Sequence, residues 1–104
     1  MREFVDYEGR RIRLTDERHA HILEHPEMAG MDVRIAETLG HPLEVVESLS
    51  DSDARLYYRY YVGTRIGGKY LSVVVKILPA DAFVVTAYLT DRVKSGKVLW
   101  PREK

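Results

Sequence analysis

The chain has no cysteine among its 104 residues. This excludes disulfides, a catalytic thiol and any cysteine-ligated metal. It also lacks a long apolar run, and its N-terminal stretch alternates charged with apolar residues, so we expect neither a signal peptide nor a membrane span. Hydrophobic residues at 45% and charged residues at 31% are typical of an ordinary folded protein. We therefore expect one cytoplasmic domain over residues 1–104, with a frayed tail over about residues 101–104.

The chain carries no net charge of either sign, but its charges are unevenly distributed. Residues 1–50 hold 6 Lys/Arg and 11 Asp/Glu, whereas residues 51–104 hold 10 Lys/Arg and 5 Asp/Glu. All formal charges between Ala54 and Ala80 are positive: Arg55, Arg59, Arg65, Lys69 and Lys76. Such an imbalance is typical of a surface that binds a polyanion. It is equally typical of two surfaces that neutralise each other within one fold.

The N-terminal half predicts two helices after a short strand or hairpin that turns at Gly9. Thr15 is a good N-cap and Pro26 a helix stop, so the first helix should cover about Asp16–His25. After a loop over residues 26–30, a second helix should end at Gly40. A short valine-rich strand over Leu43–Glu47 follows.

The C-terminal half predicts three strands, at about Arg55–Val62, Tyr70–Leu78 and Ala82–Thr90. Gly67-Gly68 and the segment 79–81 are turn-like connections, so the strands should form an antiparallel meander. With the strand over Leu43–Glu47, this gives an α+β fold. In it, two helices pack on a mainly antiparallel sheet of about four strands.

Each of the three strands has one apolar face and one face with hydroxyl and cationic groups. If the apolar faces coincide, the opposite surface holds six polar or aromatic residues: Arg59, Tyr61, Ser72, Lys76, Thr86 and Tyr88. Tyr57 shares the face of Arg59, and Lys69 precedes the second strand. These groups suit phosphate binding. The alternative is a solvated sheet face in which Thr and Tyr serve only as good strand formers.

Four histidines lie in the first half of the chain, at positions 19, 21, 25 and 41. His21 and His25 have the i, i+4 spacing that places two side chains on one helix face, and histidine is suited to proton transfer near neutral pH. The same five residues match the H-x-x-E-H pattern of inverted zinc metallopeptidases, with Glu27 or Glu37 as a possible third ligand. A zinc hydrolase is therefore an alternative, weakened by Pro26 at the second histidine.

Several motifs together carry a family resemblance. They are Leu14-Thr15-Asp16-Glu17-Arg18 with His21 and His25-Pro26-Glu27, His41-Pro42 with Val45-Val46-Glu47-Ser48, Tyr58-Arg59-Tyr60, Tyr70-Leu71 with Val73-Val74-Val75, and Val85-Thr86-Ala87-Tyr88. Over about residues 11–100 the chain resembles the phage-associated (PBECR-type) branch of the barnase–EndoU–colicin E5/D–RelE nuclease superfamily. A tryptophan expected before the first motif histidine is His19 here. The resemblance implies a barnase/RelE-like domain and a metal-independent endoribonuclease, often a toxin with an antitoxin or immunity protein as partner.

Together, these observations define a set of site residues and a chemistry. By position, the resemblance places catalytic roles on His21, His25, Arg59, Thr86 and Tyr88. The polar strand faces add substrate-binding roles for five residues: Tyr57, Tyr61, Lys69, Ser72 and Lys76. The substrate is RNA, cleaved by attack of the 2′-hydroxyl to leave a 2′,3′-cyclic phosphate, with no cofactor. The alternative within the same fold is a module that binds RNA or another anion without cleaving it.

Overall fold

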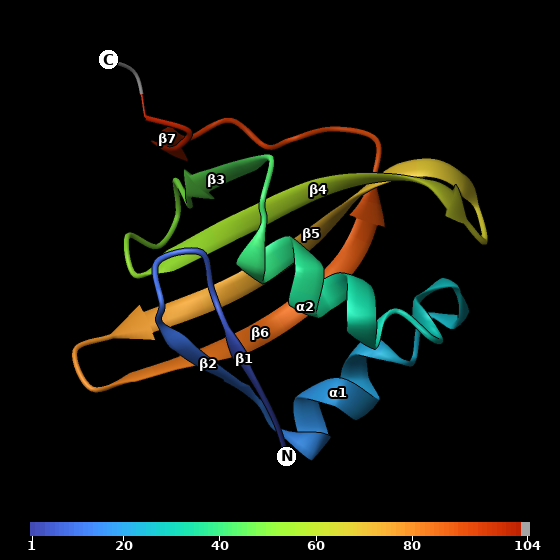
Figure 1. The fold of residues 1–104 in the computed structure, drawn as a ribbon, viewed down its shortest axis with the longest axis horizontal. Coiled ribbons are helices and arrows are strands. Elements are labelled where there is room, and N and C mark those ends of the chain that lie inside the picture. The colour runs from blue at the N-terminus through green and yellow to red at the C-terminus, as the bar shows by residue number, and fades with distance from the viewer. Residues whose placement is uncertain (103–104) are drawn as a thin grey trace.

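The computed structural model describes residues 1–102 and contains one mixed β-sheet with two α-helices on it (Figure 1). Within that range, the helices are α1 (Asp16–Ile22) and α2 (Asp32–Gly40), with a short 3-10 helix at Pro26–Met28 between them. The strands are β1 (Arg2–Val5), β2 (Arg11–Leu14), β3 (Glu44–Glu47), β4 (Ala54–Thr64), β5 (Gly67–Leu78), β6 (Asp81–Thr90) and β7 (Lys97–Trp100). Their order across the sheet is β1-β2-β6-β5-β4-β3-β7.

The prediction of about four strands is wrong, because the sheet has seven strands over residues 1–102, although it is mainly antiparallel as expected. The N-terminal hairpin joins one side through a parallel contact between β2 and β6, at Arg13 and Phe83. Arg13 fixes this contact with two hydrogen bonds to Asp81, of 3.0 and 2.7 Å. The tail supplies the other edge, where β7 pairs antiparallel with β3. Of the predicted frayed tail, residues 103 and 104 lie outside the described residues.

The predicted antiparallel meander is confirmed by the pairing of β4 with β5 and of β5 with β6. These are the longest strands, at 10 to 12 residues. Gly67, the first residue of β5, has φ +91° at the turn from β4, a backbone conformation that glycine adopts without strain. The three long strands form the centre of the sheet, to which shorter strands attach on either side.

Both helices pack on the sheet, with α2 lying across one face (Figure 1). α2 contacts β5, β4 and β1, while α1 contacts β6. The main core lies between the helices and this face of the sheet, and includes Ile22, Ile35, Leu39, Leu71 and Val73. We refer to this side as the helix face and to the other as the open face.

The first helix is shorter than predicted because it ends at Ile22 rather than near His25. Thr15 is the N-cap as expected, its hydroxyl oxygen accepting a hydrogen bond from the Arg18 amide at 3.2 Å. His25 has φ −92° and ψ 110°, the extended backbone that a following proline favours. Pro26 therefore ends the α-helix already in the turn before it, and the chain then forms the 3-10 helix that begins at Pro26.

No helix over residues 1–102 is long or apolar enough to span a bilayer. α1 has 7 residues and α2 has 9, whereas a spanning helix needs about 20.

The segment that follows β6 returns to the sheet and packs on a smaller hydrophobic cluster on the open face. Val93 packs against this cluster of Val46, Leu56 and Tyr58, and the Lys94 amide donates a hydrogen bond to the Tyr58 hydroxyl at 3.2 Å. Gly96 then passes so close to β3 that a Cβ atom would collide with the Glu47 carbonyl oxygen and the Val46 side chain.

Gly96→Ala is therefore expected to destabilise the protein by about 1–3 kcal/mol, the usual cost of forcing an extra methyl into a packed contact. Urea unfolding would measure it. Gly40→Ala is the matched control, because a Cβ at Gly40 meets only ordinary van der Waals contact. A Gly96→Ala protein as stable as wild type would show that the segment between β6 and β7 can shift away from β3 at little cost.

Candidate functional site

The strand register divides the predicted surface between the two faces of the sheet. Tyr58 pairs with Ser72, and Ser72 with Tyr88, so these three lie on the open face. Arg59 pairs with Leu71, and Tyr61 with Lys69, on the helix face. The prediction of one shared polar surface is therefore wrong. Arg59 and Tyr61 lie on the opposite face of the sheet from the other four predicted members, Ser72, Lys76, Thr86 and Tyr88. The alternation in β4 was right, but the face predicted to be polar, with Tyr57 and Tyr61, packs under the helices, while Tyr58 is fully buried in a smaller cluster on the open face.

A cavity of about 720 Å³ occupies the open face. Its floor comes from β4, β5 and β6, and its rim from the loop over residues 48–51, the start of α1 and the segment after β6. Cationic and hydroxyl groups dominate its polar lining: Arg18, Lys76, Lys94, Ser48, Ser50, Thr86, Tyr88 and Ser95. The apolar lining comprises Ala54, Leu49, Leu56, Val74, Phe83 and Val85. A mixed lining of this kind and size is typical of ligand sites.

The charges around the open-face cavity are unequal. Asp51 is the acidic lining residue, and its Oδ2 lies 3.0 Å from Lys76 Nζ. Hydrogen bonds from the Asp53 amide and from Lys76 hold the pKa of the Asp51 carboxyl below its usual range. Lys94 Nζ lies 5.8 Å from the centre of the Tyr88 ring. Three cations therefore face one carboxylate, which favours an anionic ligand.

Tyr88 provides the most informative polar atom of the open-face cavity. Its hydroxyl is buried and has no hydrogen-bond partner among residues 1–102. Leaving a buried hydroxyl unpaired costs about 1–3 kcal/mol, so buried polar groups in folded proteins almost always have partners. The hydroxyl of Ser72, the cross-strand neighbour of Tyr88, is likewise buried and without a partner in residues 1–102. Because the Tyr88 hydroxyl itself is not exposed, it reaches a ligand oxygen in the cavity when its ring, which lines the cavity, moves.

Of the two predicted catalytic histidines, the structure places only His21 on α1. His21 follows Arg18 by three residues, so the two side chains share one face of the helix, and Arg18 lines the open-face cavity. His21 is exposed, with Nδ1 3.8 Å from Glu24 Oε1. His25 lies beyond the helix end. The i, i+4 relation expected of them does not hold because the helix stops between them.

Three other predicted site residues bond within the protein away from the open-face cavity. Arg59 Nη1 donates to the His41 carbonyl oxygen at 2.7 Å, and Arg59 Nε lies 3.4 Å from Glu37 Oε1. The Tyr61 hydroxyl donates to the same carboxylate at 2.5 Å; burial and this bond raise the Tyr61 pKa. Lys69 Nζ pairs with Asp91 at 2.5 Å.

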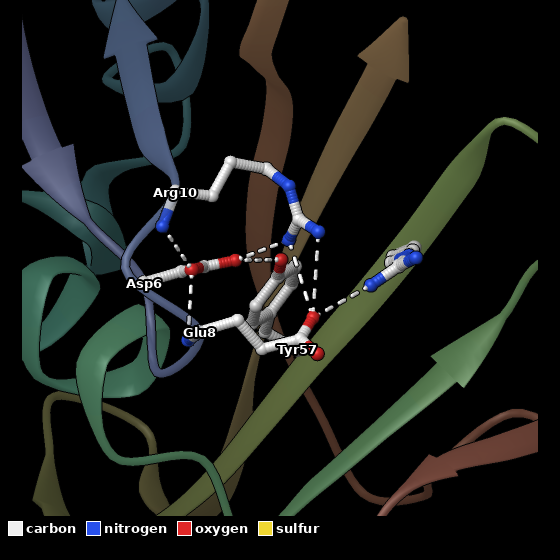
Figure 2. Close-up of polar contacts among 5 residues, drawn as sticks. Asp6, Glu8, Arg10 and Tyr57 are labelled. Carbon is white, nitrogen blue, oxygen red and sulfur yellow. Dashed lines mark hydrogen bonds and ion pairs between the residues drawn. The ribbon is translucent and has the colours of Figure 1, made fainter. Parts of the chain in front are cut away.

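Tyr57, a predicted substrate-binding residue, is part of the core. Its side chain is fully buried, and its hydroxyl donates to Asp6 Oδ2 at 2.7 Å (Figure 2). Burial, reinforced by the Asp6 carboxylate, raises the pKa of Tyr57. The hydroxyl is thus committed to the fold and is not available to a substrate.

Other cavity residues were missed by sequence reasoning because they come from the chain's irregular parts. Lys94 and Ser95 belong to the segment after β6, and Ser48 and Ser50 to a polar turn. Arg18 was part of the motif that carries the family resemblance. No local pattern places a loop or a chain end over a particular sheet face.

No group of three or more His, Asp or Glu side chains within residues 1–102 is arranged to hold a metal ion. The H-x-x-E-H pattern depends on one helix that carries both histidines. Because α1 ends at Ile22, the pattern does not have that geometry here.

Comparison with family models, curated proteins and solved structures finds no match for this chain.

Proposed function

We propose that this protein is a metal-independent endoribonuclease that binds the RNA backbone in the open-face cavity. The observation that carries the proposal is the lining of this cavity. Arg18, Lys76 and Lys94 surround hydroxyl groups, and the Tyr88 hydroxyl among them has no protein partner in residues 1–102. Cations with preorganised donors stabilise the negative charge of a phosphorane. The sequence resemblance to a nuclease superfamily points the same way.

The proposed reaction is an internal transesterification. A base removes the proton from a ribose 2′-hydroxyl, and the 2′-oxygen forms a bond to the adjacent phosphorus. The bond from phosphorus to the 5′-oxygen breaks, and that oxygen takes up a proton. The products are a 2′,3′-cyclic phosphate and a 5′-hydroxyl, so no oxidant, reductant or cofactor is consumed. DNA lacks the 2′-hydroxyl and is not cleaved by this route.

The proposal gives separate roles to the groups around the open-face cavity. Arg18 and Lys94 hold the phosphate oxygens, and Lys76 joins them when it exchanges Asp51 for the ligand. Tyr88 donates its hydroxyl to the oxygen that gains charge. His21, beside Arg18 on α1, is the histidine that moves the proton. Thr86 lines the floor and orients the phosphate.

The second candidate is a module that binds RNA or another anion without cleaving it. One observation favours it: His21 is exposed, and its ion-pair contact is with Glu24 rather than with a cavity residue. Binding requires only the cations and hydroxyls, whereas cleavage also requires a group that moves a proton.

The test is incubation with single-stranded RNA in the presence of a chelator. We expect cleavage that the chelator does not reduce, with fragments ending in 2′,3′-cyclic phosphate. RNA with 2′-O-methyl groups should bind with similar affinity but stay intact, because it cannot cyclise. If unmodified RNA binds and also stays intact, the binding module is correct. Loss of activity with the chelator, restored by zinc, would instead favour a hydrolase.

A further inference from the structure

A second cavity, of about 700 Å³, lies near the C-terminal strand and shares no lining residue with the open-face cavity. Residues from four parts of the chain line it. Tyr7 and Glu8 come from the turn between β1 and β2, and His41 follows α2. Arg59 comes from β4, and Trp100 and Arg102 come from the C-terminal end. Arg59, predicted as a site residue, thus lies in a different concave site.

The second cavity has an aromatic wall. The rings of Tyr7 and Trp100 have centroids 5.2 Å apart with planes at 45°. Trp100 is 38% exposed and Tyr7 partly buried, so neither ring is enclosed by the core. Exposed aromatic faces of this kind stack on planar bases.

The same cavity also holds groups for an anion. Arg59 is oriented by its contacts with the His41 carbonyl oxygen and Glu37, and its Nη2 has no partner among residues 1–102. Arg102 adds an exposed guanidinium. A held guanidinium with unused donors suits a phosphate better than a mobile lysine does.

Glu8 adds an acceptor to the second cavity. Its Oε1 takes the contacts from Arg10 and from Arg55, the latter at 3.1 Å. Its Oε2 has no hydrogen-bond or ion-pair partner within residues 1–102. A carboxylate oxygen beside an aromatic wall accepts from the amino or imino group of a base edge, as carboxylates do in base recognition. A phosphate alone would use the guanidinium groups but neither the rings nor this oxygen.

From this arrangement we infer that the second cavity binds a free nucleoside monophosphate. The base stacks on Trp100 and Tyr7, Glu8 accepts from the base edge, and Arg59 and Arg102 hold the phosphate. The cavity volume is within the range for small-molecule sites. The inference does not depend on the proposed ribonuclease, because the two cavities have no residue in common.

Trp100 is the only tryptophan of the chain, so its fluorescence reports directly on this cavity. Titration with guanosine 5′-monophosphate should change that fluorescence saturably, with half-saturation at or below about 1 mM, as a few charge-assisted contacts provide. A free tryptophan amide titrated in parallel corrects for absorption by the nucleotide. Guanosine and ribose 5-phosphate, which each lack one half of the ligand, should bind at least about tenfold more weakly.

Variants separate this site from the open-face cavity. Arg102→Ala, at an exposed position, should weaken binding about tenfold without affecting the fold. Arg59→Lys should weaken it as well, because it keeps the charge but removes the planar fork. Lys76→Ala, in the open-face cavity, should leave the titration unchanged. Absence of a saturable change, an equal response to inorganic phosphate, or loss of binding in Lys76→Ala would each overturn the inference.

Discussion

Tyr88→Phe is expected to slow RNA cleavage by about 100-fold, the usual loss when one donor to a charged transition state is removed. The free energy of unfolding should stay unchanged or rise slightly. The Tyr88 hydroxyl is buried and has no partner in residues 1–102, so phenylalanine removes a polar group that the fold already leaves unsatisfied. A hydroxyl with a structural role would give the opposite result, with stability lost and activity kept.

Two measurements are needed on the same Tyr88→Phe protein: single-turnover cleavage in chelator and urea unfolding. Tyr60→Phe is the matched control. Tyr60 also lies on the open face of the sheet, but it is 45% exposed and does not line the cavity. It should retain wild-type cleavage. Equal rates for Tyr88→Phe and wild type would remove Tyr88 from the proposed mechanism, whatever the stability.

The sequence predicts the elements of this fold better than their assembly. The three long strands and the Thr15 cap follow from local patterns of alternation and capping, and the structure confirms both. The attachment of β2 and β7 to the sheet does not follow, because each strand has only four residues. Their pairing depends on contacts with residues far away in the sequence, such as that of Arg13 with Asp81. The pattern of residues within a short strand does not predict such contacts.

The candidate site was only partly predictable, for a reason that lies in β4. This strand has tyrosines on both faces, so either Tyr58 and Tyr60 or Tyr57 and Tyr61 can be assigned to the core. In the structure Tyr57 and Tyr58 are both fully buried, on opposite faces, and their hydroxyls bond to distant segments, at Asp6 and Lys94, which the pattern of the strand does not encode. Lys76, Thr86 and Tyr88 were placed together correctly, although the register shift between Val74 and Val75 also brings Phe83 and Val85 to the cavity, where strict alternation would place them on the face of Ala87. The histidine pair was misplaced because the helix stops at Ile22.

Asp6→Ala is expected to lower the free energy of unfolding by about 3–5 kcal/mol, the usual loss when one partner of a buried charged network is removed. The Asp6 carboxylate has no exposed surface, and it accepts four hydrogen bonds. The backbone amides of Glu8 and Arg10 donate to Oδ1, at 3.0 and 2.8 Å. Arg10 Nη1 and the Tyr57 hydroxyl donate to Oδ2, both at 2.7 Å (Figure 2).

The loss is large because alanine leaves several donors unsatisfied at once. The Tyr57 hydroxyl is buried in the core and loses its acceptor, and Arg10 loses its closest counter-charge. The turn itself also depends on Asp6, since Gly9 with φ +83° lies between the two backbone donors. A protein of this size has a total stability of only about 5–15 kcal/mol, so Asp6→Ala approaches the limit of folding.

Two further variants test the prediction for Asp6→Ala: Asp6→Asn as an intermediate case and Asp53→Ala as the control. Asparagine keeps one acceptor oxygen and the shape of the side chain but loses the charge, so its loss should lie between those of wild type and Asp6→Ala. Asp53 is exposed and its side chain forms no ion pair within residues 1–102, so Asp53→Ala should unfold at the wild-type urea concentration. If Asp6→Ala unfolds there too, the hairpin turn does not depend on this network. Tyr57 would then be held in the core by its apolar contacts alone.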